Sequence, residues 1–550
     1  MSIKKIFIIC SLALIFFPNC SVNMMVDSEI YFRINQVGFL PDEYKSAIIL
    51  ANTNLDGTKA ELRNTKTNKT VFSTILINSL GQYGNFKYTY SVNFTSIIET
   101  GEYILEAGNR KSFPFQISIN ANNGIAESLL EFFQVQRCGY TEPKEHNVCH
   151  IVDATSIIEG NRVISQRIDL TGGWHDAGDY VKFLNTTAYS TYILLFAYEF
   201  NPSKFSFDKN NNGIPDILEE AKIGLDWMHR AVYNDKFITQ VQDLRDHNVG
   251  WRMPEDDPLA FDRPAFVGIG KNLIGIYSAT MALASRIWRE KMKYPEYADK
   301  CLNAAEKFYS IRNRVPDVDR SGTGMYIDNV FEGKMALGAI ELYLTTNKTS
   351  YLNEAKVFAD SAGSDYWWSW GNINSIAHYK IAKFDDKHKS FIKNNLAHFT
   401  TNMHNNLFGL GTALSWGTNH TILGITFQNI LWKRLTNDNS FDMLSVIQKD
   451  YLLGRNPWGI CFIYGFGNNY TKNFHHQISF LKGKLPGGFA AGPATKEFIK
   501  SYKIPYDKTD SYAKFQTNEI YYRDDRMDYI TNEPTITANA TAIFVFGNLK

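Results

Sequence analysis

The sequence predicts two folded domains, a β-sandwich of immunoglobulin-like size followed by a much larger helical domain. A chain of 550 residues with 44% hydrophobic residues is too long for one ordinary domain and can bury a large core. Residues 30–118 contain short runs that alternate apolar and polar side chains, and the apolar period then changes to that of helices. The formal net charge of +1 argues against the basic surface of a nucleic-acid-binding protein.

Residues 1–20 have the layout of a bacterial secretory signal, because Lys4 and Lys5 precede an apolar run that is too short to span a membrane and is interrupted at Pro18. Cys20 stands where a lipoprotein signal is cleaved and lipidated. We therefore expect a lipoprotein at the bacterial outer membrane or cell surface. Simple secretion, or release into the periplasm, is the alternative.

The first domain is expected to consist of short strands separated by turn residues. Period-two alternation predicts these strands at 46–50, 59–63, 87–94, 103–106 and 113–117. Phe113, Phe115 and Ile117 are expected to share one face of the last strand. The segment lacks the Cys and Trp core of antibody domains, so only the sandwich architecture is predicted.

Residues 124–550 are expected to form the helical domain. Apolar side chains at Ala126, Leu129, Leu130 and Phe133 follow the i, i+3, i+4, i+7 spacing of a helix face. Similar stripes recur later, at Ile276, Ala279, Leu283 and Ile287, and at Met335, Gly338, Ala339 and Leu342. Long loops rich in Gly, Asn, Asp and Trp connect these helices, and such loops on a rigid scaffold are common sites of chemistry.

The first candidate site is the Gly-rich loop from Gly172 to Tyr180, in which Asp176 and Asp179 stand three residues apart. Two neighbouring carboxylates can hold and deprotonate a water molecule, one as general base and the other as its orienter. The alternative is a pair of ordinary turn-forming Asp residues.

The second candidate site is the acidic stretch from Tyr522 to Glu533, followed by Asn539 and Ala540. An acid that protonates a leaving group needs a raised pKa, and a Glu among apolar and aromatic neighbours can obtain one. The alternative is a solvated run of charges.

Three segments together resemble glycoside hydrolase family 9, the (α/α)6-barrel β-1,4-glucanases: the loop 172–183, His475 and His476 after the segment 453–457, and the stretch 524–540. Residues 34–41, INQVGFLP, resemble the start of the immunoglobulin-like domain that precedes the barrel in one branch of that family. The resemblance covers nearly the whole mature chain. It implies an immunoglobulin-like β-sandwich over 30–118 and an all-α (α/α)6 barrel over 124–550.

The resemblance also implies catalytic roles. Asp179 is expected to be the general base, Asp176 to help hold the attacking water and Glu533 to be the general acid, while His475 and Asp524 support the substrate and the acid. The family inverts the anomeric centre, and an inverting pair needs about 6.5–9.5 Å between its carboxyl groups. Asp510 and Glu519 repeat the spacing of Asp524 and Glu533, but only Glu533 has the residues that follow it in the family.

One position departs from the family pattern: Gln477 stands where the family has Arg after its His. Because Arg offers a charged fork of donors and Gln a neutral amide, contact with the sugar is expected to be weaker or rearranged there. Trp rings in Gly- and Asn-rich loops are expected to stack on sugar faces. The expected substrate contacts are Trp251, Trp370, Trp416, His476 and Gln477.

The sequence predicts two structural metal sites. Residues 208–219, DKNNNGIPDILE, fit a twelve-position calcium loop, although an Asn-rich turn that caps the next helix is the alternative. The expected calcium ligands are Asp208, Asn210, Asn212, Ile214, Asp216 and Glu219.

The second set is Cys138, Cys149, His150 and His175, which the resemblance strengthens because some family members hold zinc with such residues. Four protein ligands with no open position would make the zinc structural, and it would hold the loop of Asp176 in place. A disulfide between Cys138 and Cys149 is the alternative in an oxidising compartment.

The function expected from these observations is an exported endo-β-1,4-glucanase that acts with inversion on cellulose-like, mixed-linkage or xyloglucan chains. One alternative is an exo-acting β-glucosidase or β-glucosaminidase on oligosaccharides. Another is a non-catalytic surface lipoprotein that binds glycans. We expect a monomer with no nucleic-acid partner and with membrane contact only through the lipid anchor.

Overall fold

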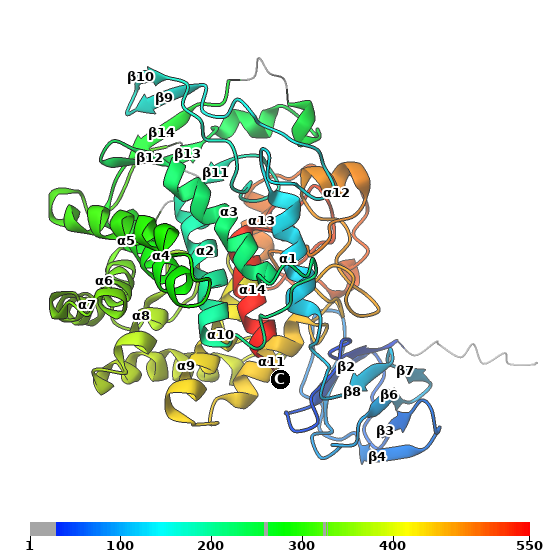
Figure 1. The fold of residues 1–550 in the computed structure, drawn as a ribbon. Helices are drawn as coiled ribbons and strands as arrows, with labels where there is room; N and C mark the ends of the chain where they lie inside the picture. The colour runs from blue at the N-terminus through cyan, green and yellow to red at the C-terminus, as the bar shows by residue number, and fades with distance from the viewer. Residues whose placement is uncertain (1–28, 258–261, 323–325, 327, 550) are drawn as a thin grey trace, which may run out of the picture.

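The computed structural model describes residues 29–257, 262–322, 326 and 328–549. It contains a β-sandwich followed by a helical barrel, so the predicted fold class is confirmed (Figure 1). The predicted signal, residues 1–20, lies outside the described residues. None of the described helices is both long and apolar enough to cross a membrane.

The β-sandwich consists of two antiparallel sheets. One sheet has the order β1-β2-β5, with bounds Ile30–Arg33, Ser46–Ala51 and Tyr88–Asn93. The other has the order β4-β3-β6-β7, with β8 also paired to β6; its bounds are Thr70–Ile75, Lys59–Asn64, Gly101–Ala107, Arg110–Lys111 and Phe115–Ile117. Alternate residues such as Ile49, Leu62 and Leu105 fill the core between the sheets.

One prediction about this domain is wrong. Phe115 and Ile117 are buried, but Phe113 is 52% exposed. The strand β8 begins only at Phe115, directly after Pro114, so Phe113 does not share the register of the sheet. Proline cannot donate a ladder hydrogen bond and is therefore found at the start of a strand rather than inside it.

Six inner helices form the closed ring of the barrel, in which each packs against the next and α14 packs against α2. They are α2 (Leu184–Phe200), α4 (Lys271–Glu290), α6 (Glu332–Thr346), α8 (Asn374–Ile381), α10 (Thr418–Thr436) and α14 (Ile536–Asn548). Their side chains are buried nearly all round, as expected for helices enclosed by others; in α14 every residue from Ile536 to Phe546 is buried.

Six outer helices cover this ring (Figure 1). They are α1 (Ile125–Gln136), α3 (Asp216–Arg230), α5 (Pro295–Ser310), α7 (Thr349–Ala362), α9 (Lys389–His404) and α11 (Asp442–Leu452). Helices such as α3 and α5 bury one apolar stripe and expose a charged face, which is the pattern of a helix on the surface of a domain. The short helices α12 (Gln477–Lys482) and α13 (Lys496–Ser501) lie in the long segment before α14.

A six-stranded sheet that the sequence did not predict lies beside the barrel (Figure 1). Its strands are β9 (Ser156–Glu159), β10 (Arg162–Gln166), β11 (Lys182–Phe183), β12 (Val232–Tyr233), β13 (Lys236–Val241) and β14 (Ala265–Gly268). β11 pairs with β13 and leads directly into α2. The sheet therefore anchors the end of the Asp-containing loop 172–183.

The sandwich is attached to the barrel through buried polar contacts. Asn35 donates to the Asp450 carboxylate at 2.8 Å, and Arg33 donates to the carbonyl oxygen of Pro457 at 2.6 Å. The Arg33 guanidinium also lies over the ring of Phe515, 4.2 Å from its centroid. These contacts bury polar groups of both domains at their junction, and removal of the sandwich would leave the Asp450 carboxylate and the Pro457 carbonyl oxygen without these partners.

Candidate active site

A cleft with a volume of about 1080 Å³ opens at one end of the barrel. It is lined by the segments that precede or begin α2, α6, α8, α10 and α14, and therefore lies at the N-terminal ends of the inner helices. Its walls are rich in aromatic rings, and the only carboxylates among the described lining residues are those of Asp179 and Glu533.

Two of the predicted motifs meet at Gly178. Gln477 donates its backbone N–H to the carbonyl oxygen of Gly178 at 3.1 Å, and a Cβ atom at residue 178 would lie 2.3 Å from the carbonyl oxygen of His475. The loop 172–183 and the segment around His475 can approach this closely because residue 178 has no side chain. The Gly178 N–H in turn donates to the Glu533 carboxyl group at 3.2 Å, so one residue joins all three segments of the site.

Asp179 is held as a carboxylate by a residue that the sequence did not single out. His247 Nε2 lies 2.8 Å from Asp179 Oδ2, and the Val181 N–H donates to Oδ1 at 2.9 Å. Burial alone would raise the pKa of Asp179, but the hydrogen bond and positive charge of His247 lower it below its ordinary value. The same hydrogen bond raises the pKa of His247 to about 9, so the pair is ionised at neutral pH.

The pKa of Glu533 is raised, whereas that of Asp179 is lowered. Burial and the negative charge of Asp179 raise the pKa of Glu533 to about 8, so this carboxyl group carries a proton at neutral pH. One cleft thus holds an ionised carboxylate and a protonated carboxylic acid, which is the division of labour that a general base and a general acid require. Glu519, the residue in the repeated motif, is exposed and does not line the cleft.

Asp176 lies below the cleft rather than in its wall. Its backbone N–H donates to Val181, and its carbonyl oxygen accepts from Ile536 at the start of α14. Neither carboxylate oxygen has a hydrogen-bond partner of ordinary geometry within the described part of the chain, and burial raises the pKa of the group to about 7. The hydroxyl groups of Thr186 and Tyr326 act in the opposite direction and favour the ionised form, but burial outweighs them.

His475 lines the cleft, whereas Asp524 lies outside the cleft lining and contacts the segment that carries His475. His475 Nδ1 lies 2.8 Å from the carbonyl oxygen of Arg526, and its ring makes an edge contact with Trp251, with centroids 5.0 Å apart. Burial lowers the pKa of His475 to about 4, so the ring is neutral; since Nδ1–H donates to the Arg526 carbonyl oxygen, the other nitrogen, Nε2, is a hydrogen-bond acceptor. The Asp524 carboxylate accepts the backbone N–H of Asn473 at 2.8 Å and so fixes the segment that carries His475.

The expectation that His476 contacts sugar is wrong. The side chain is buried, its Nε2–H donates to the side-chain oxygen of Gln136 at 2.7 Å, and its ring packs against Phe132 outside the cleft lining. The reason is local geometry: His475 and His476 are consecutive residues before a helix, and only one of them can face the cleft.

Gln477 does line the cleft, but its amide is used inside the protein. Its side-chain oxygen accepts the backbone N–H of Arg252 at 2.8 Å, beside Trp251. Trp251 is stacked on Phe480 with centroids 4.1 Å apart. Gln477 therefore braces the loop that presents Trp251 instead of offering a free fork of donors.

The expected aromatic platforms are present in two groups. Trp370 contacts Tyr326, which contacts Phe183, and all three line the cleft. The second group, also in the cleft wall, contains Trp416, Tyr502 and Tyr529.

Sequence reasoning missed His247, Tyr326 and the two Tyr residues of the second group. The only local signal for His247 was an Asp-His pair followed four residues later by Trp251. Tyr326 and the other Tyr residues carry no distinctive neighbours in the sequence.

Cys138, Cys149, His150 and His175 are all buried, and their ligand atoms lie within 4.8 Å of one another. The two thiols are not joined in a disulfide. The His150 Nδ1 and His175 Nε2 atoms point to the same space, 3.1 Å apart, while His150 Nε2 lies 2.7 Å from the Asp257 carboxylate. Thiolates, imidazoles and an orienting carboxylate are the donor set of structural zinc, so the residues fit that ion.

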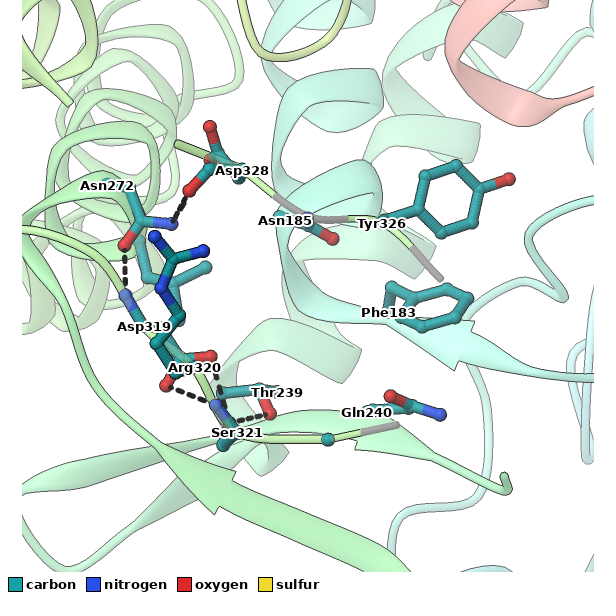
Figure 2. Close-up of a pocket in the computed structure, with 12 residues that line it drawn as sticks. Phe183, Asn185, Thr239, Gln240, Asn272, Asp319, Arg320, Ser321, Tyr326 and Asp328 are labelled. Atoms are coloured by element: carbon teal, nitrogen blue, oxygen red, sulfur yellow. Dashed lines mark hydrogen bonds between the residues drawn. The ribbon is translucent and has the colours of Figure 1, made fainter. Parts of the chain in front are cut away.

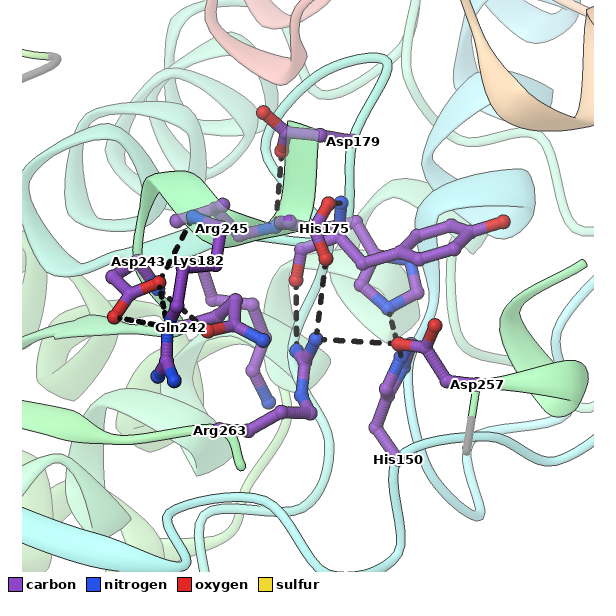
Figure 3. A network of polar contacts seen from close by, with 12 residues as sticks. His150, His175, Asp179, Lys182, Gln242, Asp243, Arg245, Asp257 and Arg263 are labelled. Carbon is purple, nitrogen blue, oxygen red and sulfur yellow. Dashed lines mark hydrogen bonds and ion pairs between the residues drawn. The ribbon is translucent and has the colours of Figure 1, made fainter. Parts of the chain in front are cut away.

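A buried ionic network links this cluster to the catalytic loop (Figure 3). From His150 it passes through Asp257 to Arg252, which donates to Asp246 at 2.7 Å. Asp246 then accepts the backbone N–H of Tyr180, the neighbour of Asp179, at 3.0 Å. The Cys2His2 cluster and the general-base candidate therefore belong to one rigid unit.

The predicted calcium loop forms a compact turn before α3. The carboxylate of Asp208 accepts the N–H groups of Asn212 and Gly213, and Asn210 donates to Glu219 at 3.0 Å. The side-chain amides of Asn210 and Asn212 both donate to the Glu219 carboxylate, which holds the loop against the first turn of α3. Asp216 instead accepts the N–H of Lys209.

An ionised carboxylate and a protonated carboxylic acid in one aromatic cleft suit the acid–base cleavage of a glycosidic bond. The chain matches the family described as "Glycosyl hydrolase family 9" over residues 123–546, and "Cellulase N-terminal ig-like domain" over 27–112. It therefore belongs to glycosyl hydrolase family 9 and is a glycoside hydrolase.

Characterised relatives cover most of the chain. Endoglucanase D of Acetivibrio thermocellus is 28% identical over 538 residues, which cover 90% of this chain and 82% of that protein. The xyloglucan-specific endo-β-1,4-glucanase BoGH9A of Bacteroides ovatus is 22% identical, with coverage of 96% and 95%.

Solved structures share the fold. A metagenome-derived family 9 endoglucanase superposes with a TM-score of 0.80 at 23% identity, covering 94% of this chain and 99% of that one. A zinc-binding triple mutant of the family 9 endoglucanase J30 superposes with a TM-score of 0.77 at 22% identity, covering 92% and 99%.

Proposed function

We propose that the protein is an endo-β-1,4-glucanase that hydrolyses internal bonds of β-glucans with inversion at the anomeric carbon. The observation that carries this proposal is the opposite protonation of Asp179 and Glu533 in one aromatic cleft. The names of the relatives support the endo mode and the β-1,4-glucan substrate. The volume of the cleft, about 1080 Å³, and its two aromatic groups suit several consecutive sugar units.

The reaction follows from the charges of the two groups. Asp179 accepts a proton from a water molecule as its oxygen attacks the anomeric carbon, and Glu533 gives its proton to the glycosidic oxygen as that bond breaks. The imidazolium of His247 keeps Asp179 ionised before the attack. The water approaches from the face opposite the leaving sugar, so the new hydroxyl has the inverted configuration.

Product analysis tests the proposal. Soluble mixed-linkage β-glucan, xyloglucan and carboxymethylcellulose are incubated with the mature protein and with Glu533→Gln, and the first product is followed by NMR. Oligosaccharides whose new reducing ends are α-anomers are the expected result, and Glu533→Gln should release none. Monosaccharide alone would favour the exo-acting alternative, and binding without turnover would favour a glycan-binding protein.

We propose zinc as the ion of the Cys2His2 cluster, where it would fix Cys138 and His175 at the base of the catalytic loop. Support comes from the buried, unbridged thiols and from the zinc-binding endoglucanase with the same fold. Metal analysis of the purified protein should give about one zinc per chain, reduced to background in Cys149→Ser. Alkylation of Cys138 and Cys149 only after reduction would instead support a disulfide between them.

We also propose a structural calcium in the loop 208–219, supported by the twelve-position ligand pattern with Gly213 at its sixth position. Calcium should raise the thermal midpoint of the wild type, and Glu219→Gln should remove most of that increase. An unchanged midpoint would indicate that the loop is only an Asn-rich helix cap.

Finally, we propose that Cys20 becomes the lipidated N-terminus of a monomeric surface protein, on the layout of residues 1–20. Expression with a labelled fatty acid should label the wild type and not Cys20→Ser. Release of unlabelled wild-type protein into the medium would instead indicate simple secretion.

A further inference from the structure

A second, smaller cavity lies next to the cleft. Its volume is about 190 Å³, and two of its lining residues, Phe183 and Tyr326, also line the cleft. The rings of these two residues are in contact, with centroids 4.8 Å apart, and form a rim that the two spaces share. We call this cavity the side pocket.

The side pocket is built from well-separated parts of the chain. Asn185 comes from the start of α2, Thr239 and Gln240 from β13, Asn272 from the start of α4, and Ser321 from the segment before α6. Figure 2 shows these side chains around one space, with Tyr326 and Phe183 at its edge. The site is therefore part of the folded barrel and not a feature of one loop.

The charges of the side pocket are internally balanced. Asp328 is paired with the buried Lys334 ammonium at 2.6 Å and receives the amide of Asn272 at 3.2 Å. Asp319 accepts both the N–H and the hydroxyl group of Ser321. Because Asp328 is paired with Lys334 and the lining also holds the opposite charges of Asp319 and Arg320, the pocket has no net charge and is suited to a neutral, hydroxyl-rich ligand.

The size and lining fit one sugar ring. A water molecule takes about 30 Å³ of liquid volume, so 190 Å³ holds a few waters or one pyranose unit, but not a chain of sugars. Aromatic faces beside amides, hydroxyls and carboxylates are the combination that contacts both the apolar faces and the hydroxyl groups of a sugar.

We propose that the side pocket binds a single sugar unit attached as a branch to the glucan backbone in the cleft, and that branched β-glucans are the preferred substrates. This inference rests on the proposed endo-glucanase function. The position of the side pocket supports this inference. A backbone unit in contact with Tyr326 and Phe183 lies at the mouth of the pocket, and a one-unit substituent can enter there while the backbone continues along the cleft. When the chain has no branch, water fills the pocket. A sugar unit that fills it tightly adds contacts with the protein, so a branched chain is favoured over a plain one.

The test compares two substrates of equal backbone length, an unsubstituted cello-oligosaccharide and one with single α-xylosyl branches. Ser321→Tyr fills the pocket, since Ser321 lines it, whereas Ser321→Thr keeps the hydroxyl group and serves as the matched control. Asn185→Leu removes a polar lining group at similar volume. Thermal midpoints show whether each variant folds.

We expect the wild type to have a kcat/KM at least about tenfold higher on the branched substrate. Ser321→Tyr should lower that ratio by about tenfold while kcat/KM on the unsubstituted substrate stays within about twofold. Ser321→Thr should leave the ratio unchanged, and Asn185→Leu should lower it less than Ser321→Tyr does.

An unchanged ratio in a folded Ser321→Tyr variant, or an equal loss on both substrates, would overturn the side-pocket proposal. If the wild type cleaves the unsubstituted substrate and Glu533→Gln does not, the proposed function stands whatever the ratio does. If the wild type cleaves neither substrate, the proposed function fails and the side-pocket inference fails with it.

Discussion

At the C-terminal ends of four inner helices, α2, α4, α6 and α8, acidic and basic side chains pair with one another, whereas the carboxyl groups of Asp176 and Glu533, before the N-terminal ends of α2 and α14, have no such paired cation among the described residues. At the C-terminal ends, Glu341 contacts both Arg286 and Lys380, which also pair with Glu199. At the N-terminal ends, burial raises the pKa of both Asp176 and Glu533, and Glu533 keeps its proton at neutral pH.

The pKa values express this difference. Burial alone would raise the pKa of Glu199, but the charges of Lys380 and Arg286 lower it to about 2. Burial and the charge of Asp179 raise the pKa of Glu533 to about 8. Burial disfavours the ionised form of a carboxyl group in both regions. Neighbouring cations outweigh this effect at Glu199, whereas at Glu533 the effect remains and keeps the acid protonated.

The largest expected effect separates the two members of the catalytic pair. Both Asp179→Asn and Glu533→Gln should lower kcat on a soluble β-glucan by about 10³-fold or more. An aryl β-cellobioside with a good leaving group needs no acid, so Glu533→Gln should keep much of its rate on that substrate and Asp179→Asn should not. Equal losses on the aryl glycoside would contradict the assigned roles.

Substitutions in the cluster of Glu199, Arg286, Glu341 and Lys380 should change the stability of the protein but not its catalytic rate. Glu341→Gln leaves Arg286 and Lys380 without their shared buried partner, which should lower the free energy of unfolding by about 3–5 kcal/mol. Denaturant unfolding measures this change, and kcat per folded molecule should stay at the wild-type value. A large loss of kcat without loss of stability would show that this region also serves the reaction.

The pH profile tests how His247 sets the two pKa values. The kcat/KM of the wild type should fall as the pH rises through about 8, because Glu533 then loses its proton, and should fall at acidic pH, where Asp179 gains one. His247→Asn removes a positive charge that lowers the pKa of both carboxyl groups. Both limbs should therefore move to higher pH, and kcat/KM at neutral pH should drop about tenfold. A profile that does not move would show that His247 does not control the pair.

The smallest effect concerns the brace at Gln477. Gln477→Leu removes the acceptor for the backbone N–H of Arg252, a hydrogen bond worth about 0.5–1.5 kcal/mol. We expect kcat/KM to fall a few-fold, mainly through KM as Trp251 loses its fixed position. Gln477→Glu retains an acceptor and should stay closer to the wild type, while equal effects of the two substitutions would argue against the brace.

Much of the fold was predictable because it depends on local patterns. Period-two runs and the i, i+3, i+4, i+7 stripes correspond to strands and helices, as at β2, β3 and α1. The six-stranded sheet beside the barrel was not predicted, because strands such as β11 and β14 are only a few residues long and pair with segments far away in the sequence.

Part of the site could also be inferred from sequence. The motif context distinguishes Glu533 from Glu519, and the spacing of Cys138, Cys149, His150 and His175 identifies a set of ligands that the fold brings together. The sequence by itself therefore determines which segments contain the reactive side chains and which stretches form buried helices and strands.

Only the tertiary structure decides what those side chains do. His247 reaches Asp179 from another loop, and His475 and Gln477 line the cleft while His476, between them, is buried on the opposite side. A carboxyl group becomes an acid or a base through its burial and the charges within a few ångströms. Those neighbours come from distant segments, so the protonation of Asp179 and Glu533 is fixed only when the barrel closes.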